Sequence, residues 1–195
     1  NFHFSNNVLK RFIGACNSLD AEWYIRYNGD NIFHCPANHE QFLNAVCNSD
    51  IQIITNTQNR SLPNGISFEA VKADFLNELD ISNSDEYEKE HIFPAIYSAA
   101  NMTQVFNIHH DVNKYDINFS LDSVKDSLFF INRKSDKYII NAKDQELQSI
   151  YNERKTFDNE TPFIGESGVF TIAEIGGNHE GDFEYAKNLV KQATF

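Results

Sequence analysis

Cysteine and long apolar runs are scarce in this sequence of 195 residues. The three cysteines, Cys16, Cys35 and Cys47, are an odd number without the spacing of a metal site, which argues against a disulfide framework and fits a reducing cytoplasm. No apolar run approaches the ~20 residues of a membrane helix, and no charged-then-apolar signal opens the chain. These absences predict a cytoplasmic protein without a membrane partner.

Basic residues are also few. The chain has 16 Lys and Arg against 28 Asp and Glu, for a formal net charge of −12. An acidic surface repels phosphate backbones, so nucleic acid is not an expected partner. An acidic enzyme that takes anionic sugar acids or nucleotides must bring in a cation or focus its few Arg and Lys in one place. With 41% hydrophobic and 13% aromatic residues, the composition is nevertheless that of a globular protein.

The two ends of the chain predict a piece of a longer protein. The first residue is Asn1 rather than Met, and Phe195 follows directly on a helix-like run. The length suits one well-packed domain plus a short extra element. The sequence leaves open whether the chain is a natural product or a truncated fragment, and it leaves a homodimer open.

Strands and helices alternate along the first 155 residues. Asn6 or Asn7 is placed to cap the first expected helix, and Pro94 disturbs the fourth. This alternation favours an α/β layer structure. The expected strands are 22–27, 51–55, 105–108 and 117–121, and the expected helices are 8–19, 41–47, 68–79, 85–100, 123–132 and 149–155.

A polar stretch with Pro162 and two glycines separates this part from the last residues. We therefore expect a first domain at 1–158, a linker at 159–168 and a last segment at 169–195. The last segment predicts one strand and one helix around a glycine-rich loop. A single βα unit cannot bury both of its faces, so it belongs to a larger sheet or barrel.

Two aspartates are candidates for a Mg²⁺ site. Asp30 and Asp122 each follow the C-terminal end of an expected strand, which is the edge where open α/β sheets collect ligands. Mg²⁺ prefers a few carboxylates together with phosphate oxygens and water. The alternative is structural: Asp30 ends a turn after Gly29, and Asp122 caps the helix that follows.

Three cations and one charged stretch give weaker signals. Arg26, Arg60 and Lys72 could attract a carboxylate or a phosphate, although such side chains are usually solvated or paired. The stretch 88–91, which ends in His91, is explained most simply as the solvated face of a helix.

Residues 173–182 crowd polar side chains beside three glycines. Glu174, Asn178 and His179 fall at the C-terminal end of an expected strand, where β/α barrels build their active sites. The structural alternative is a glycine-rich turn in which Asp182 caps the next helix.

Five stretches of the first domain resemble one enzyme family. They are NVLKRF (7–12), YIRYNGD (24–30), LPNGISFE (62–69), EKEHIFPAIY (88–97) and NFSLDS (118–123). In this order and spacing they resemble the spore-coat polysaccharide cytidylyltransferase family, relatives of the CMP-sugar-acid synthetases, over residues 6–155. The resemblance implies a Rossmann-like nucleotide-diphospho-sugar transferase fold.

By this resemblance, a sugar hydroxyl attacks the α-phosphate of CTP and gives a CMP-sugar and pyrophosphate. Such chemistry needs positioning and charge neutralisation more than a strong base. The resemblance implies that Asp30 and Asp122 are the Mg²⁺ ligands. It also implies that Arg26, Glu69 and His91 bind the substrate or the nucleotide.

The chain departs from the family pattern at several places. Asn31 replaces the start of a Cys-Pro-Leu-like stretch, Ser67 replaces an Asp, and Asn118 replaces an Arg. The family's first strand and its phosphate-binding loop are also missing. We therefore expect the fold without its first strand, and we expect this chain by itself to bind CTP weakly and to be inactive.

Residues 169–195 resemble the start of the N-acetylneuraminate (sialic acid) synthase family. The match is IAEIGGNHEGD (172–182), followed by Ala186 and Lys187. That family condenses phosphoenolpyruvate with an N-acetylated sugar in a TIM barrel and uses a divalent metal such as Mn²⁺ or Mg²⁺. The resemblance implies the first βα unit of such a barrel, with Glu174, Asn178 and His179 as its catalytic residues and the other metal ligands outside this chain.

Together the two resemblances predict a protein of nonulosonate biosynthesis, because a synthase makes the sugar acid that a cytidylyltransferase activates. The expected small-molecule partners are CTP, a sugar acid and phosphoenolpyruvate. The rival interpretation is a non-catalytic cytidylyltransferase-like scaffold or sugar-binding module attached to an active synthase. The departures at Asn31, Ser67 and Asn118 favour this rival.

Overall fold

The computed structural model describes residues 7–113, 116–132 and 138–160, together with residues 184, 185, 187 and 188. The chain divides into two compact units, Asn1–Arg154 and Lys155–Phe195. In the second unit the described residues are helical, and the expected linker from 161 onward and the expected strand 169–175 lie outside the described residues. Across the described part of the chain, no helix combines the length and the apolar character needed to cross a bilayer.

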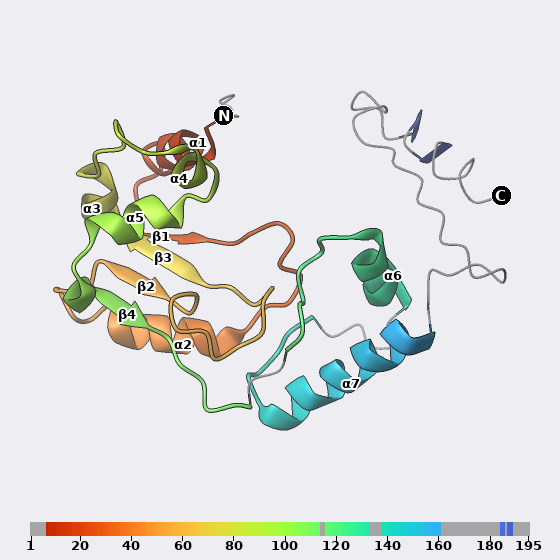
Figure 1. Ribbon diagram of the computed structural model, residues 1–195. Coiled ribbons are helices and arrows are strands. Elements are labelled where there is room, and N and C mark those ends of the chain that lie inside the picture. The colour runs from red at the N-terminus through yellow and green to blue at the C-terminus, as the bar shows by residue number, and fades with distance from the viewer. Residues whose placement is uncertain (1–6, 114–115, 133–137, 161–183, 186, 189–195) are drawn as a thin grey trace. The chain divides into compact units, whose positions relative to one another are not determined.

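A four-stranded mixed sheet organises the first unit (Figure 1). Its strands, in the spatial order β1-β3-β2-β4, are β1 (Trp23–Arg26), β2 (Ile53–Thr55), β3 (Glu69–Lys72) and β4 (Val105–Asn107). β3 runs antiparallel to both of its neighbours, whereas β2 and β4 are parallel. As a consequence β1, β2 and β4 point the same way and end at the same edge. The strands expected at 22–27, 51–55 and 105–108 are confirmed.

The helix expected at 68–79 is wrong in its first half. Residues Glu69–Lys72 form β3, and only Ala73–Asn77 form helix α3. β3 is a central strand, with Ala70 in the apolar core on one face of the sheet and Val71 in the core on the other. A strand that is apolar on both faces lacks the alternation of apolar and polar residues that distinguishes a strand from a helix. The spacing of the apolar residues therefore predicted a helix here.

The other helices form near the expected places, with different bounds: the helix expected at 41–47 begins at Pro36, and the one expected at 8–19 ends at Cys16. The Asn7 side chain caps the first by accepting the Lys10 N–H at 2.8 Å. The helix expected at 85–100 breaks at Ile92, whose φ of 28° is not helical, and Pro94 then lies in the first turn of the second piece. These helices are α1 (Val8–Cys16), α2 (Pro36–Ala45), α4 (Glu86–Glu90), α5 (Phe93–Ala99), α6 (Val124–Asn132) and α7 (Asp144–Glu160), with a 3-10 turn at Met102–Gln104.

Helix α7 is longer than the helix expected at 149–155. It continues to Glu160, so the first two residues of the expected linker are helical. Arg154 on α7 forms an ion pair of 2.8 Å with Asp126 on α6, and both side chains are largely buried. At the start of α6 the capping side chain is Ser123, whose hydroxyl accepts the Asp126 N–H at 3.2 Å. The alternative that Asp122 caps this helix is therefore wrong.

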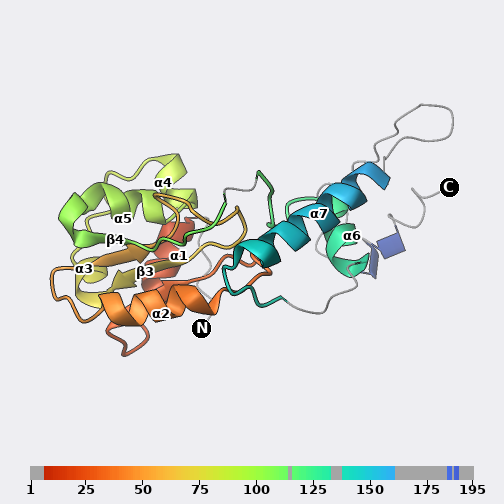
Figure 2. The same ribbon diagram turned by 90° about the horizontal axis from the view of Figure 1, so that it is seen from below.

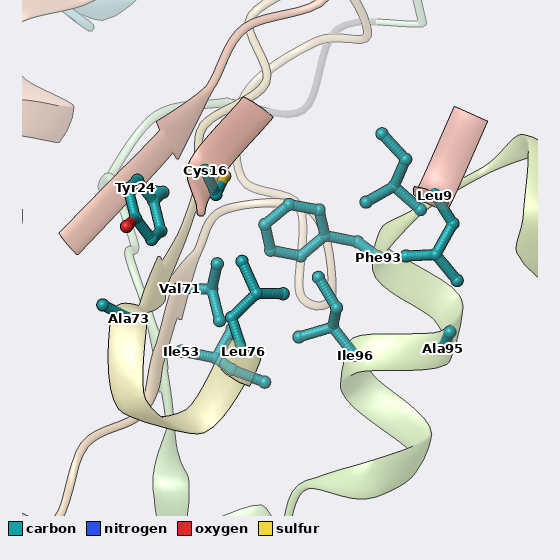
Figure 3. Close-up of a cluster of buried hydrophobic side chains, with 11 residues drawn as sticks. Leu9, Cys16, Tyr24, Ile53, Val71, Ala73, Leu76, Phe93, Ala95 and Ile96 are labelled. Atoms are coloured by element: carbon teal, nitrogen blue, oxygen red, sulfur yellow. The ribbon is translucent and has the colours of Figure 1, made fainter. Parts of the chain in front are cut away.

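Helices lie on both faces of the sheet (Figure 1 and, from the α2 side, Figure 2). An apolar core fills the space between the sheet and the helices on each face. α2 covers one face, where Phe42 packs against Ile54 and Phe68. Helices α1, α3 and α5 cover the other face, and Phe93 lies among their side chains with 1% of its surface exposed (Figure 3). The buried side chains of this second core include Leu9, Cys16, Tyr24, Ile53, Val71, Leu76, Phe93 and Ile96.

Gly65 is the point at which the segment after β4 packs on the loop before β3. The Phe119 N–H donates to the Asn64 carbonyl at 2.8 Å. Gly65 has a φ of +86°, and a Cβ added to it would lie 2.3 Å from the carbonyl carbon of Phe119. The stretch 117–121, which was expected to be a strand of the sheet, instead joins the fold through isolated bridges. This part of the fold therefore depends on a residue without a side chain at position 65.

We expect Gly65→Ala to lower the free energy of unfolding by about 2–4 kcal/mol, because the added Cβ meets backbone atoms and the left-handed φ is strained. Urea unfolding followed by circular dichroism measures the change. Gly29→Ala is the matched control, since no described atom lies within 4 Å of a Cβ added there. Equal stability of the two variants would contradict the packing of 117–121.

His110 and Asn38 form a buried hydrogen bond between α2 and the segment after β4. His110 Nε2 lies 2.7 Å from Asn38 Oδ1, so a ring protonated on Nε2 donates to the amide oxygen. The His110 backbone N–H donates to the Ser61 hydroxyl at 2.9 Å. Burial, with a smaller contribution from His109, lowers the pKa of His110 below its ordinary value of 6.5. The folded state therefore favours the neutral ring.

This preference predicts a loss of stability in acid. Below about pH 6.5 the unfolded chain binds a proton at His110 that the folded state resists, so the free energy of unfolding falls as the pH drops. His110→Gln keeps an N–H donor and should give a smaller fall between pH 7 and pH 5, measured by urea unfolding at each pH. His109→Gln, at the exposed neighbour, should keep most of the wild-type slope, because His109 makes only the smaller contribution to the lowered pKa of His110. Identical slopes for wild type and His110→Gln would refute the assignment.

Candidate functional site

A row of polar side chains crosses the sheet at the edge where β1, β2 and β4 end. The strand register pairs Arg26 with Glu69, Glu69 with Thr55, and Thr55 with Asn107. Cross-strand partners project from the same face of a sheet. On each strand, two residues farther from this edge, the same face of the sheet carries the apolar core under α1 and α5. The polar row thus lies at the C-terminal edge of parallel strands, where α/β sheets bind their ligands.

Glu69 is the centre of this row. Its Oε2 accepts a hydrogen bond from Arg26 Nη1 at 2.9 Å, in an ion pair whose side chains are 22% and 10% exposed. Its Oε1 accepts from the Tyr97 hydroxyl at 3.0 Å and from the Thr57 hydroxyl at 3.3 Å. Both carboxylate oxygens are therefore satisfied by groups from β1, α5 and the loop after β2.

Tyr97 carries α5 into this network. Its hydroxyl lies 2.8 Å from Thr55 Oγ1 and 2.9 Å from Thr57 Oγ1, besides its bond to Glu69. Burial, and next the negative charge of Glu69, raise the pKa of Tyr97 above its usual range. The phenol therefore stays protonated and acts as a hydrogen-bond donor to the carboxylate.

A polar cavity of about 470 Å³ opens beside the network. Arg26, Glu69 and His91, the three residues assigned to substrate or nucleotide binding by resemblance, all line it. The structure thus brings together positions that lie far apart in the sequence, and their role in binding stays a prediction. The other lining residues are Asn28, Thr57, Gln58, Arg60, Ser67, Tyr87, Pro94 and Tyr97.

The charged stretch 88–91 divides between structural and site positions. Glu88 closes a capping box with Asp85 at the start of α4, and Lys89 pairs with Glu86 at 2.5 Å on the surface. Only His91 of this stretch lines the cavity, at the C-terminal end of α4 and 4.5 Å from the ring of Tyr87. The solvated-face interpretation therefore describes the first residues of the stretch but not its last.

The three candidate cations are also separated by the fold. Arg26 and Arg60 both line the cavity, whereas Lys72 lies at the other end of β3, paired in register with Trp23. Arg60 Nη2 donates to the Ser67 hydroxyl at 3.1 Å. The cavity therefore has two arginines, of which one is already bound to Glu69.

Sequence reasoning missed the residue that shapes the cavity loop. Asn56, with 1% of its surface exposed, donates from Nδ2 to the Ile66 carbonyl at 2.7 Å and accepts the Phe68 N–H at 2.8 Å. These bonds close the loop 57–67, which carries Arg60 and Ser67. A polar Asn directly after a buried apolar strand was the available signal, since buried amides need partners.

Asp30 and Asp122 belong to segments that the structure brings together. The Leu121 N–H donates to the Asp30 carbonyl at 3.0 Å, so the residue before Asp122 lies against Asp30. Asp30 Oδ1 is buried and has no hydrogen-bond partner among the described residues. Asp122 is exposed, and its Oδ2 accepts the Asn118 amide at 2.6 Å.

One feature of this pair, the buried Asp30 oxygen, suits a Mg²⁺ ligand, and neither aspartate is among the residues that line the cavity. A buried carboxylate oxygen without a donor is costly unless a cation reaches it, and Mg²⁺ is commonly held by one or two carboxylates plus phosphate oxygens and water. In the part of the chain that the structure describes, no group of three or more His, Cys, Asp or Glu residues could hold a metal alone. A metal at Asp30 and Asp122 would therefore need a ligand to complete its coordination.

The residues assigned by resemblance to the synthase barrel, Glu174, Asn178 and His179, lie outside the described residues. No TIM-barrel unit is seen in the described part of the chain. The cavity at the sheet edge is therefore the candidate functional site of this structure.

Comparisons with known proteins support the fold. No family model matches the chain, and a search of curated proteins finds no match. Among solved structures, a cytidylyltransferase from Leptospira borgpetersenii serovar Hardjo-bovis (strain JB197) is similar, with a TM-score of 0.57 and 18% identity over 82% of this chain and 68% of that chain. The chain thus has a mixed α/β fold that is cytidylyltransferase-like, and the comparisons give no support to the synthase resemblance.

We expect Asn56→Ala to destabilise the fold by about 1–3 kcal/mol, because it leaves a buried N–H and a buried carbonyl without partners. Chemical denaturation measures the change. Asn59→Ala, at an exposed position of the same loop, should stay within about 0.5 kcal/mol of wild type. If both variants unfold together with wild type, Asn56 does not hold the loop.

Proposed function

We propose that this chain carries a cytidylyltransferase-type domain that transfers CMP from CTP to a sugar acid. The observation that supports this most is the polar cavity at the C-terminal edge of the sheet, walled by the Arg26, Glu69 and Tyr97 network, in a fold similar to that of a cytidylyltransferase. The order of motifs along the first domain agrees with it. The proposal assigns nucleotide and sugar to this edge.

In the proposed reaction the sugar hydroxyl oxygen forms a bond to the α-phosphorus of CTP. The bond from that phosphorus to the oxygen bridging the β-phosphate breaks, pyrophosphate leaves, and the hydroxyl proton is released. The chemistry depends on orientation and on charge neutralisation. Mg²⁺ held by Asp30 and Asp122 would supply part of that neutralisation when bound.

The side chains of the cavity then act by positioning. Glu69 fixes the direction of the Arg26 guanidinium, and Tyr97 fixes Glu69. Because both Glu69 oxygens are occupied, this carboxylate serves as a support rather than as a base. His91 and Tyr87 form an aromatic rim on the same cavity, which suits a sugar or base ring.

The proposal places the chain in nonulosonate biosynthesis. This rests on the resemblance of 172–182 to the synthase family, since condensation of phosphoenolpyruvate with an N-acetylated sugar makes the acid that cytidylyl transfer activates. On this view Glu174, Asn178 and His179 act in the condensation together with a divalent metal such as Mn²⁺ or Mg²⁺. Both activities are proposed for the protein to which the chain belongs.

A second candidate is a non-catalytic sugar-binding module. One observation favours it: groups that a catalyst would direct at its substrate already have partners within the chain. Arg26 is bound to Glu69, and Asp122 Oδ2 accepts the Asn118 amide. A binding module needs the cavity but not the aspartate pair.

The test is CTP-dependent release of pyrophosphate by the full-length protein with Mg²⁺ and a sugar acid. Asp30→Asn and Asp122→Asn should each lower the rate by about 100-fold or more, because a Mg²⁺ ligand is lost. Asp50→Asn is the matched control, since Asp50 is exposed and precedes β2 at the opposite edge of the sheet.

Wild-type protein that binds a sugar acid without releasing pyrophosphate would support the module instead. Full activity of Asp30→Asn and Asp122→Asn would remove the metal assignment.

A further inference from the structure

We propose that Arg60 is the anion-recognition residue of the cavity at the sheet edge, and that Ser67 is the positioning residue, whose neutral hydroxyl orients the guanidinium without an ion pair. The ligand group is an oxyanion, either a carboxylate or a phosphate, on a molecule the size of a monosaccharide or a nucleoside. This is the cavity to which the proposed function assigns nucleotide and sugar, and only the identity of the ligand rests on that function.

The charges that line the cavity identify Arg60. Arg26 and Glu69 cancel in an ion pair of 2.9 Å. Arg60 forms no ion pair with any residue that the structure describes, and its recorded partner is the neutral hydroxyl of Ser67. Arg60 is thus an exposed arginine on the cavity wall whose charge feels Glu69 but is not taken up in an ion pair, in a chain with a net charge of −12.

Arg60 is attached to a fixed piece of backbone. The two residues that follow it, Ser61 and Leu62, are buried, and the Ser61 hydroxyl accepts the His110 N–H at 2.9 Å. Asn56 closes the loop at its other end through the Ile66 carbonyl. Because the backbone of the loop is already ordered, anion binding costs mainly the conformational entropy of the exposed Arg60 side chain.

The bond to Ser67 sets the direction of the guanidinium and leaves donors for a ligand. It uses one arm of the fork, Nη2, at 3.1 Å. A planar guanidinium can then present its other N–H groups to two oxygens of one carboxylate or phosphate. A carboxylate in place of Ser67 would occupy the same fork and neutralise it. Position 67 therefore sets how much of the Arg60 charge is available to a ligand.

The size and lining of the cavity define the rest of the ligand. At about 470 Å³ it exceeds the volume of a single phosphate or acetate and falls in the range of small-molecule sites. Asn28 and Gln58 supply amides for hydroxyl or carbonyl groups, and the exposed ring of Tyr87 supplies a flat apolar wall. An anionic sugar or a nucleoside monophosphate satisfies these features.

Isothermal titration calorimetry on the purified chain tests the inference without requiring turnover. The probes are two matched pairs, CMP against cytidine and N-acetylneuraminate against its methyl ester, so that each pair differs by one oxyanion. Arg60→Gln should weaken binding of the anionic member by about 10- to 100-fold, as expected for a lost charge-assisted hydrogen bond, and leave the neutral member unchanged. Arg11→Gln, at an exposed arginine of α1, is the matched control.

Two substitutions test Ser67, one that adds a negative charge and one that keeps the hydroxyl. Ser67→Asp should abolish the preference for the anionic probe although Arg60 is intact, and Ser67→Thr, which keeps the hydroxyl, should retain it. Thermal unfolding of each variant shows that the fold is preserved. If Ser67→Asp does not fold, Arg60→Lys provides the second test, since it should keep charge attraction but lose part of the affinity.

The outcomes separate this inference from the proposed function. Loss of CMP binding in Arg60→Gln identifies a phosphate, and loss of N-acetylneuraminate binding identifies a carboxylate; either supports the inference even if no pyrophosphate is ever released. Equal binding of charged and neutral probes, or unchanged affinity in both Arg60→Gln and Ser67→Asp, overturns it even if cytidylyl transfer is observed.

Discussion

The ion pair between Arg26 and Glu69 is the interaction on which the site depends. It joins the ends of β1 and β3, and Glu69 also receives hydroxyl groups from α5 and from the loop after β2. A pair this buried adds little net stability, because desolvation offsets most of the attraction. Loss of one partner would nevertheless leave a charge unpaired, at a cost of about 3–5 kcal/mol. Its contribution is therefore geometric: one carboxylate fixes four segments at one edge of the sheet.

The same pairing determines how the cavity treats charge. Because Glu69 neutralises Arg26, the positive charge that the cavity can offer to a ligand comes from Arg60 in the loop 57–67. That loop is held by a buried amide at Asn56 and by the close approach of the backbone at Gly65. The fixed ends of the loop hold the backbone of Arg60, which has no ion pair, in one place. Less backbone entropy is therefore lost when an anion binds to it.

Much of the fold could be predicted from local patterns. Strands β1, β2 and β4 are short apolar runs bounded by turn residues, and the cap at Asn7 has a short-range cause. β3 could not be recognised, because a central strand is apolar on both faces and shares that property with a buried helix. The stretch 117–121 has the alternation of a strand, but its pairing depends on segments distant in sequence.

The site divides in the same way. Arg26, Glu69 and His91 belong to motifs whose order along the chain pointed to a pocket, and the fold places all three on one cavity. Tyr97 and Ser67 also lie in these motifs, but the bonds of Tyr97 to Glu69 and of Ser67 to Arg60 form only when the chain folds. Asn56 lies outside the motifs, and its one signal was a polar residue directly after a buried apolar strand.

By itself the sequence determined the alternation of strands and helices, the acidic charge and the residues available for chemistry, since these follow from residue type and local spacing. The tertiary structure alone decided which charges cancel and which remain. Cross-strand register placed Glu69 beside Arg26, and the fold of the loop gave Arg60 a neutral partner. Whether an arginine is a structural cation or a recognition group depends on whether a carboxylate forms an ion pair with it, and that pairing exists only in the folded chain.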